Sequence, residues 1–156
     1  MRRPDRRSPS NTMTEPRVAA RLSTADSAYI AGLVDGEGTI TLVRKHKNEN
    51  KQLALTISST ERPLLEFVLA ATCVGKITGK RRYAAHHRPS YTYAVYNRQA
   101  LQVLAQLEPY LLSYKKQRCL LALQRYTLVT PRNGKYTEEM HARRRTFEES
   151  FLALVP

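Results

Sequence analysis

The sequence is short of cysteine and has no long apolar run. Cys73 and Cys119 are its only two cysteines. Both lie in apolar stretches, so we expect small buried side chains in a reducing compartment rather than a disulfide or a metal site. No segment is apolar for long enough to span a bilayer. The basic start of the chain leads into no apolar segment, which disfavours a signal peptide, and Asp5 and Glu15 weaken an organelle transit peptide.

Acidic residues are also scarce. Lys and Arg total 26 against 13 Asp and Glu, which gives a net charge of +13 and an isoelectric point near 10.1. Excess charge of this size makes the folded chain repel itself, so a polyanionic partner is expected. Nucleic acid is the first candidate and a membrane surface the second. A merely solubilising charge is the third, because soluble surfaces usually mix both signs.

Three regions differ in composition. Residues 1–24 are rich in arginine and proline and predict a disordered basic arm, which either touches DNA phosphates or is a solvated tail. Residues 25–130 carry regular apolar periodicity and predict one domain. Residues 131–156 predict a C-terminal extension that is helical over 138–154.

The periodicity of the middle region predicts alternating helices and hairpins. The expected elements are a helix over 26–35 ended by Gly36 and Gly38, a hairpin over 39–59, a helix opened by Thr60–Pro63 and ended by Gly75, a hairpin over 76–96, a helix over 99–107 capped by Asn97, and a longer helix starting at Pro109. This order predicts an α+β fold of type αββαββα(α), with a four-stranded antiparallel sheet and helices on one face.

The other face of the sheet is expected to be open and polar. Strands with Lys, Arg, Gln, Thr and Ser at two-residue spacing are suited to the major groove of DNA, although an ordinary solvated face has the same pattern. The candidate DNA-binding residues are Thr41, Val43, Lys45, Lys47, Gln52, Ala54, Thr56, Ser58, Thr78, Lys80, Arg82 and Lys116. We interpret His86 and His87 as a solvated loop rather than a metal site.

The first predicted helix carries a stripe of small residues. Ala28, Gly32 and Gly36 recur every four residues, with Asp35 beside them. Such a stripe lets another backbone approach closely, and glycine inside a helix costs about 1 kcal/mol that a contact should offset. The expected partner is the same helix of a second copy across a two-fold axis, and the alternative is a helix of the same chain.

Two carboxylates, Asp35 and Glu37, end this helix. The helix dipole disfavours negative charge there, and the two groups repel each other. A divalent cation such as Mg²⁺ beside a phosphate makes sense of the placement, and two such sites at a two-fold axis would suit cleavage of both DNA strands. The alternative is a salt bridge to Lys115 or Lys116.

The stretch IAGLVDGEG over Ile30–Gly38 resembles the motif of the LAGLIDADG homing endonucleases. The resemblance extends from about Ala28 to Tyr126. It includes both hairpins, the segments Thr56–Thr60 and Val74–Ile77, and Leu107–Leu111 followed by Lys115–Gln117. The motif occurs once, as in the single-motif members, which act as homodimers on near-palindromic double-stranded DNA.

The resemblance implies a metal-dependent DNA endonuclease, located inside the cell with DNA. By position, Glu37 is the metal ligand, assisted by the carbonyl of Gly36, and Asp35 helps hold the end of the interface helix. Glu61 is the polar catalytic residue, and Lys115 is the catalytic lysine, with Lys116 as the alternative. Mg²⁺ is the expected cation, and Mn²⁺ or Ca²⁺ suit the same ligands.

The sequence departs from the commonest pattern of this family at two positions. Tyr114 stands where strict spacing from Pro109 expects the lysine, and Glu61 is unusual at its place. A non-cleaving protein of the same fold, such as an intron maturase or a DNA-binding regulator, is therefore the second hypothesis. The presence of both Asp35 and Glu37 favours the enzyme. A basic ribosome-associated protein is the third.

Overall fold

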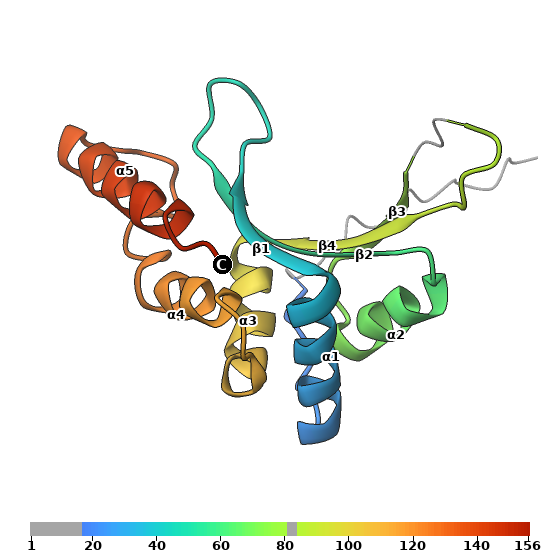
Figure 1. Ribbon diagram of the computed structural model, residues 1–156. Coiled ribbons are helices and arrows are strands. Elements are labelled where there is room, and N and C mark those ends of the chain that lie inside the picture. Colours follow the sequence, from blue (N-terminus) through green and yellow to red (C-terminus); the bar gives the residue numbers. More distant parts are fainter. Residues whose placement is uncertain (1–16, 81–83) are drawn as a thin grey trace, which may run out of the picture.

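A four-stranded antiparallel sheet, with helices packed beneath it, forms the centre of the molecule (Figure 1). The computed structural model describes residues 17–80 and 84–156. Its elements are α1 (Thr24–Glu37), β1 (Gly38–Val43), β2 (Gln52–Ser59), α2 (Arg62–Thr72), β3 (Lys76–Gly79), β4 (Tyr91–Tyr96), α3 (Asn97–Leu107), the 3-10 turn η1 (Glu108–Tyr110), α4 (Lys115–Arg125) and α5 (Glu138–Leu152). The predicted α+β class and element order are confirmed.

Helix α1 begins at an N-cap and runs directly into β1. The Ser23 side chain accepts a hydrogen bond from the backbone N–H of Asp26, as an N-cap serine should. The helix continues through Gly36 and ends at Gly38, so the prediction that Gly36 ends it was wrong. A Cβ on Gly38 would lie 2.6 Å from Val34 Cα, which explains glycine at this close junction.

The strands lie in the order β1-β2-β4-β3, with every neighbouring pair antiparallel. One face buries an apolar side chain at every second residue: Ile40, Leu42, Leu53, Leu55, Ile57, Tyr93 and Val95. Helices α1 to α4 lie on this side in Figure 1, and the opposite face carries none of them. The predicted one-sided covering of the sheet is therefore confirmed.

Three predicted helix boundaries were wrong. Cys73, in the left-handed conformation with φ 58°, ends α2, whereas Gly75 (φ 92°) lets the chain pass the Tyr93 ring. Asn97 does not cap α3, because its side chain bonds to Gln52 and Tyr126 instead. Pro109 lies in η1, and a loop separates η1 from α4.

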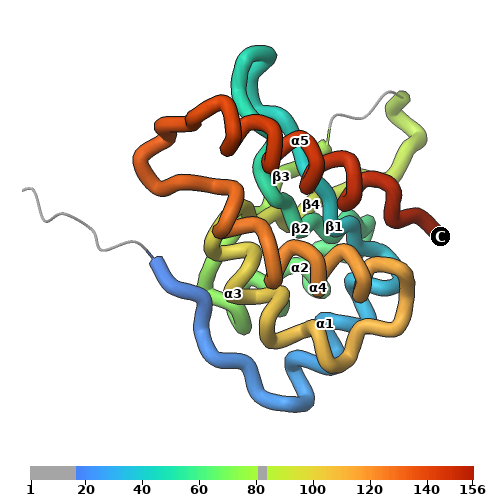
Figure 2. The backbone as a smooth tube through the Cα atoms, turned by 90° about the vertical axis from the view of Figure 1, so that its left-hand side faces the viewer, coloured from blue at the N-terminus to red at the C-terminus, as the bar shows by residue number. Residues whose placement is uncertain are grey.

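Helix α5 belongs to the same hydrophobic core as the rest of the chain. Phe147 and Phe151 are buried in the cluster that also contains Tyr126 and Ile40. Figure 2 shows α5 crossing the molecule beside α4, with which it is in contact. The helix predicted over 138–154 is thus confirmed, and its packing makes it continuous with the main fold.

Residues 17–23 of the predicted basic arm form neither helix nor strand, but hydrogen bonds tie them to the folded domain. Gln102 and Gln106 of α3 accept hydrogen bonds from the backbone N–H groups of Ala19 and Leu22, at 2.8 and 2.7 Å. The prediction of disorder was therefore wrong for these residues, because side-chain amides supply the partners that a strand would supply. Residues 1–16 of the arm lie outside the described residues.

The two cysteines differ. Cys119 is buried as predicted, and burial raises the pKa of its thiol to about 12, so the thiol stays protonated. Cys73 is exposed, which corrects the prediction that both are buried. Among the described residues, no helix is long and apolar enough to cross a membrane.

Candidate active site and nucleic-acid interface

Asp35 is held by the loop between η1 and α4. Its carboxylate accepts hydrogen bonds from the backbone N–H of Leu112 (2.8 Å), the backbone N–H of Ser113 (3.1 Å) and the Ser113 hydroxyl (2.5 Å). Burial alone would raise the pKa of Asp35, but these hydrogen bonds and the nearby charge of Lys115 outweigh it and lower the pKa. Asp35 is therefore a charged anchor that ties the end of α1 to this loop.

Lys115 closes the same end of the helix. Its side chain is buried, and its ammonium group donates to the carbonyls of Val34 and Asp35, each at 2.8 Å. The Val34 carbonyl also accepts from the Gly38 N–H, so the cation adds a second donor there, donates to the Asp35 carbonyl, and offsets the negative end of the helix dipole. The contact is with backbone oxygens and not with either carboxylate, so the salt-bridge alternative does not describe it.

Glu37 has a different environment from Asp35. Its side chain is exposed, as is Gly36 beside it. Within the described ranges, no basic side chain forms an ion pair with Glu37. Of the two carboxylates that end α1, Glu37 is thus the one available to an external ligand.

The small-residue stripe of α1 faces outward. Ala28, Gly32 and Gly36 are exposed, whereas Ile30 and Val34 on the opposite side are buried. A Cβ built on Gly32 or Gly36 would meet no atom within 4 Å. The alternative that the stripe packs against a helix of the same chain is therefore wrong for the described structure.

The remaining predicted catalytic residues lie at the surface. Glu61 is exposed and precedes α2, where its backbone N–H donates to the Ser59 hydroxyl at 3.0 Å. Lys116 lies 3.7 Å from a Glu108 carboxylate oxygen. Tyr114, at the position where the family pattern expects lysine, is half-buried with the Arg118 guanidinium 5.3 Å from its ring centroid.

The open face of the sheet gathers most of the predicted DNA-binding residues. The strand register places on this one face Thr41, Val43, Gln52, Ala54, Thr56, Ser58 and Thr78. Lys45 and Lys47 lie in the β1–β2 loop and Lys80 follows β3, all three exposed. Ala54 is fully buried between its neighbours and offers no surface to a ligand, which corrects its inclusion. Arg82 lies outside the described residues.

The register adds residues that sequence reasoning missed. Lys76 and Thr92 lie on the open face, and the Ser58 hydroxyl is 2.9 Å from that of Thr92. Only the pairing of β2 with β4 reveals this, because the two strands are distant in sequence. Lys45, Gln52 and Lys76 also line a hollow of about 480 Å³.

The charge of this face has one sign. The four strands, in the bounds given above, contain no Asp or Glu. The β1–β2 loop adds Arg44, Lys45 and Lys47, all exposed, against one acid, Glu49. A polar, basic and concave surface of this kind is complementary to a phosphate backbone.

Glu37 suits a hard divalent cation, although a single chain supplies few ligands. In the part of the chain that the structure describes, no three His, Cys, Asp or Glu residues form a group that could hold a metal ion. Mg²⁺, however, keeps several waters and is commonly bound by one or two carboxylates together with substrate phosphates. An exposed carboxylate beside helix-end carbonyls fits that requirement.

Comparisons with known proteins identify the fold. No protein-family model matches the chain, and no curated protein matches it in sequence. The crystal structure of the homing endonuclease I-CvuI with its target matches with a TM-score of 0.67 and 18% identity, over 85% of this chain and 83% of that one. The archaeal intron-encoded homing endonuclease I-Vdi141I, complexed with DNA, matches with a TM-score of 0.65 and 18% identity, over 85% of each chain.

A third match bears the name of the predicted family. The I-SmaMI LAGLIDADG homing endonuclease bound to cleaved DNA matches with a TM-score of 0.61 and 17% identity, over 88% of this chain and 47% of that one. The chain therefore spans about half of that protein and most of the other two. Together these likenesses confirm the predicted fold: the chain has the fold of the LAGLIDADG homing endonucleases.

Proposed function

We propose that this protein is a single-motif LAGLIDADG endonuclease that binds double-stranded DNA and hydrolyses its phosphodiester bonds at a specific site inside the cell. The observation that carries the proposal is the difference between the two carboxylates of α1 on a fold shared with DNA-bound homing endonucleases. Asp35 accepts three hydrogen bonds from its own chain, whereas Glu37 is exposed beside Gly36 and forms no ion pair with a described residue.

In this proposal DNA binds to the open face of the sheet. The lysines of the face and its loops neutralise phosphates, while Gln52, Thr56 and Thr78 present hydrogen-bonding groups to base edges. Glu37, with the Gly36 carbonyl, would hold the divalent cation. When bound, that cation supplies charge stabilisation to the scissile phosphate and activates water. Two crystal structures of the structural neighbour I-CvuI were obtained, one in the presence of Ca and the other in the presence of Mg.

The other predicted catalytic residues take supporting roles. Lys115 and Asp35 position the end of α1 from which Glu37 projects, since their contacts are with the helix end and the η1–α4 loop. Glu61 is exposed and is a candidate second acid at the DNA surface, and Lys116 is the candidate basic residue for phosphate contact.

The decisive test is cleavage of a randomised double-stranded DNA library with Mg²⁺, followed by sequencing of the new ends. The wild type is expected to produce ends at one preferred site, and Glu37→Gln to lose cleavage by at least about a hundredfold, as when an electrostatic stabiliser of a transition state is removed. Its binding to the same site should remain. Intact but selectively bound duplex in the wild type would instead indicate a non-cleaving regulator.

The proposal includes a homodimer in which the outward stripe of α1 meets its counterpart. Gly32→Leu should block this approach and yield a monomer, as measured by light scattering coupled to size exclusion. Its folded monomer should be at least as stable as the wild-type monomer, since a Cβ at Gly32 meets nothing and leucine favours helix over glycine by roughly 0.8 kcal/mol.

The matched control is Ala105→Leu, which places the same leucine side chain at an exposed position of α3. This variant should keep the oligomeric state of the wild type. A Gly32→Leu protein that associates as strongly as the wild type would exclude α1 as the interface.

A further inference from the structure

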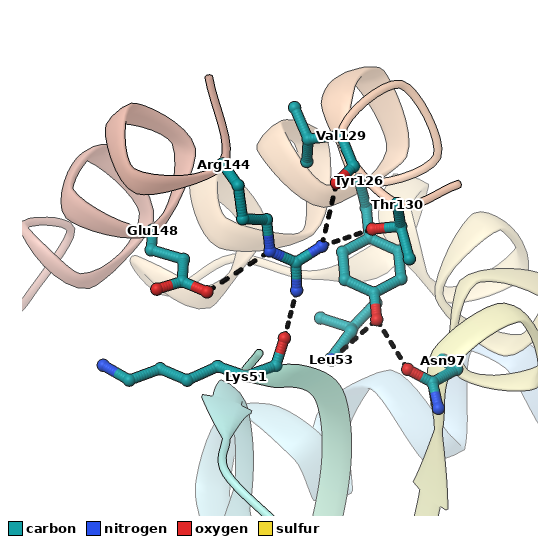
Figure 3. A network of polar contacts seen from close by, with 8 residues as sticks. All are labelled: Lys51, Leu53, Asn97, Tyr126, Val129, Thr130, Arg144 and Glu148. Carbon is teal, nitrogen blue, oxygen red and sulfur yellow. Dashed lines mark hydrogen bonds and ion pairs between the residues drawn. The ribbon is translucent and has the colours of Figure 1, made fainter. Parts of the chain in front are cut away.

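The start of β2 extends beyond the end of its neighbour β4. The last residue pair between them joins Ala54 to Tyr96, after which the chain turns into α3. The backbone of Lys51 and Leu53 therefore has no strand partner on that side. Side chains from the C-terminal part of the chain take the strand's place (Figure 3). The Tyr126 hydroxyl accepts a hydrogen bond from the Leu53 N–H at 3.2 Å, and the Arg144 guanidinium donates to the Lys51 carbonyl.

Hydrogen bonds to several other residues hold the Arg144 side chain in place for this contact. The residue is 2% exposed, and its Nε donates to Glu148 at 3.2 Å. Its Nη1 donates to the Val129 carbonyl and the Thr130 hydroxyl. The guanidinium carbon also lies 5.1 Å from the centre of the Tyr126 ring. A planar fork of donors serves three separate segments here, which a lysine cannot do.

The same network reaches the open face of the sheet. The Tyr126 hydroxyl donates to the Asn97 side chain at 2.5 Å, and the Asn97 amide donates to Gln52 at 2.9 Å. Gln52 belongs to the open face, and Lys51 immediately precedes it at the end of the β1–β2 loop. Three consecutive residues, 51 to 53, are thus held from α3, from Tyr126 directly after α4, and from α5. Figure 3 shows the contacts to Lys51 and Leu53.

We propose that α5 is a positioning element for nucleic-acid recognition, with Arg144 holding the β1–β2 loop and Gln52 in the conformation that reads DNA. The inference rests on the proposed DNA-binding function. It assigns to the C-terminal helix a role in sequence specificity, although α5 lies beside the sheet and not on its open face (Figure 1). Arg144 touches no DNA in this scheme and acts through the backbone of Lys51.

The test compares Arg144→Lys with Arg145→Lys, its exposed neighbour on the same helix. Both variants keep the net charge. Hydrogen exchange of the wild type and variants without DNA should show the amides of residues 51–53 exchanging about tenfold faster in Arg144→Lys, with the amides of 91–95 unchanged. Arg145→Lys should match the wild type throughout.

Selection from a randomised double-stranded DNA library supplies the second readout. Gln52→Ala first defines the base positions whose preference depends on Gln52. Arg144→Lys should still bind duplex and should lose preference at those positions, whereas Arg145→Lys should retain it. A variant that merely lowered global stability would lose binding at all positions alike.

The outcomes separate the two proposals. Unchanged exchange over 51–53 in Arg144→Lys, or a retained preference at the Gln52-dependent positions, overturns the role of α5. If the wild type selects no duplex sequence, the proposed function fails, while the exchange data still decide whether Arg144 holds the loop.

If Arg144→Lys fails to fold, Tyr126→Phe decides, since it keeps the ring but removes the hydroxyl that binds Leu53 and Asn97. It should accelerate exchange over 51–53, and wild-type exchange there would refute the proposal.

Discussion

Asp35 and Glu37 are two residues apart in the same helix, yet one is fixed and the other is free. An α-helix turns by about 100° per residue, so these side chains point in nearly opposite directions. Asp35 turns inward to the η1–α4 loop and accepts three hydrogen bonds. Glu37 turns outward and is exposed. Proximity in the sequence therefore says little about shared chemistry, and the helical period assigns the two acids separate tasks.

The contrast also explains how acids are tolerated at a helix C-terminus. The negative end of the dipole disfavours both groups. Lys115 places a positive charge on the last carbonyls, and the loop N–H groups stabilise the ionised Asp35 by hydrogen bonds. Glu37 receives no such contact in the described chain, and in the proposed function a divalent cation would meet its charge.

The largest expected difference in stability is between Asp35→Ala and Glu37→Ala. Removal of Asp35 leaves Ser113 and the Leu112 N–H without their acceptor, and should lower the free energy of unfolding by about 2 kcal/mol. Glu37→Ala should leave that free energy unchanged or slightly higher, because it removes an unfavourable charge–dipole interaction. Urea unfolding of both variants measures this. Equal losses in the two would remove the distinction between anchor and free acid.

A smaller loss is expected for Lys115→Met, which keeps an unbranched apolar stem but removes the ammonium group. The carbonyls of Val34 and Asp35 lose the ammonium donor, although Val34 keeps the Gly38 N–H, and the free energy of unfolding should fall by about 1 kcal/mol. Lys116→Met is the matched control, since Lys116 makes only a 3.7 Å ion pair at the surface and should change stability by less than about 0.5 kcal/mol. Equivalent effects in the two variants would contradict the capping role of Lys115.

The smallest expected effect is on the stability of the protein at acidic pH. Because the pKa of Asp35 is lowered in the folded state, its contribution to stability is complete above its ordinary value of 3.8. That contribution is lost as the pH falls from 3.8 through the folded-state pKa. Asp35→Asn should therefore flatten the acid side of the stability profile measured by chemical unfolding. Glu37→Gln is the comparison, and a profile flattened more by that variant would reverse the assignment.

Sequence patterns predicted the secondary-structure elements and the exposed faces that follow from local periodicity. Alternation over 39–59 and 76–96 predicted the strands, and the small-residue stripe predicted the outward face of α1. Contacts between distant residues could not be predicted in the same way. Three such contacts join segments far apart in the chain: the pairing of β2 with β4, the donation of Lys115 to backbone carbonyls of α1 instead of a carboxylate, and the hydrogen bonds of Gln102 and Gln106 to residues 17–23.

The wrong predictions for single residues also arose from contacts with the rest of the fold. Asn97 has the side chain of a helix cap, but Gln52 and Tyr126 lie within reach and take its hydrogen bonds. Ala54 alternates correctly with its neighbours, yet it is too small to emerge between them. In both cases the local rule was satisfied and the surroundings decided the outcome.

The direct connection between α1 and β1 constrains the geometry of the proposed dimer. Helix α1 ends at Glu37 and β1 starts at Gly38, with no loop residue to absorb a change in angle. In the proposed dimer, the helix that sets the distance between subunits is therefore continuous with a strand of each DNA-facing sheet. The spacing of the two half-sites on the duplex would be set by this joint, so longer or shorter targets would require a change in helix packing rather than in a flexible linker.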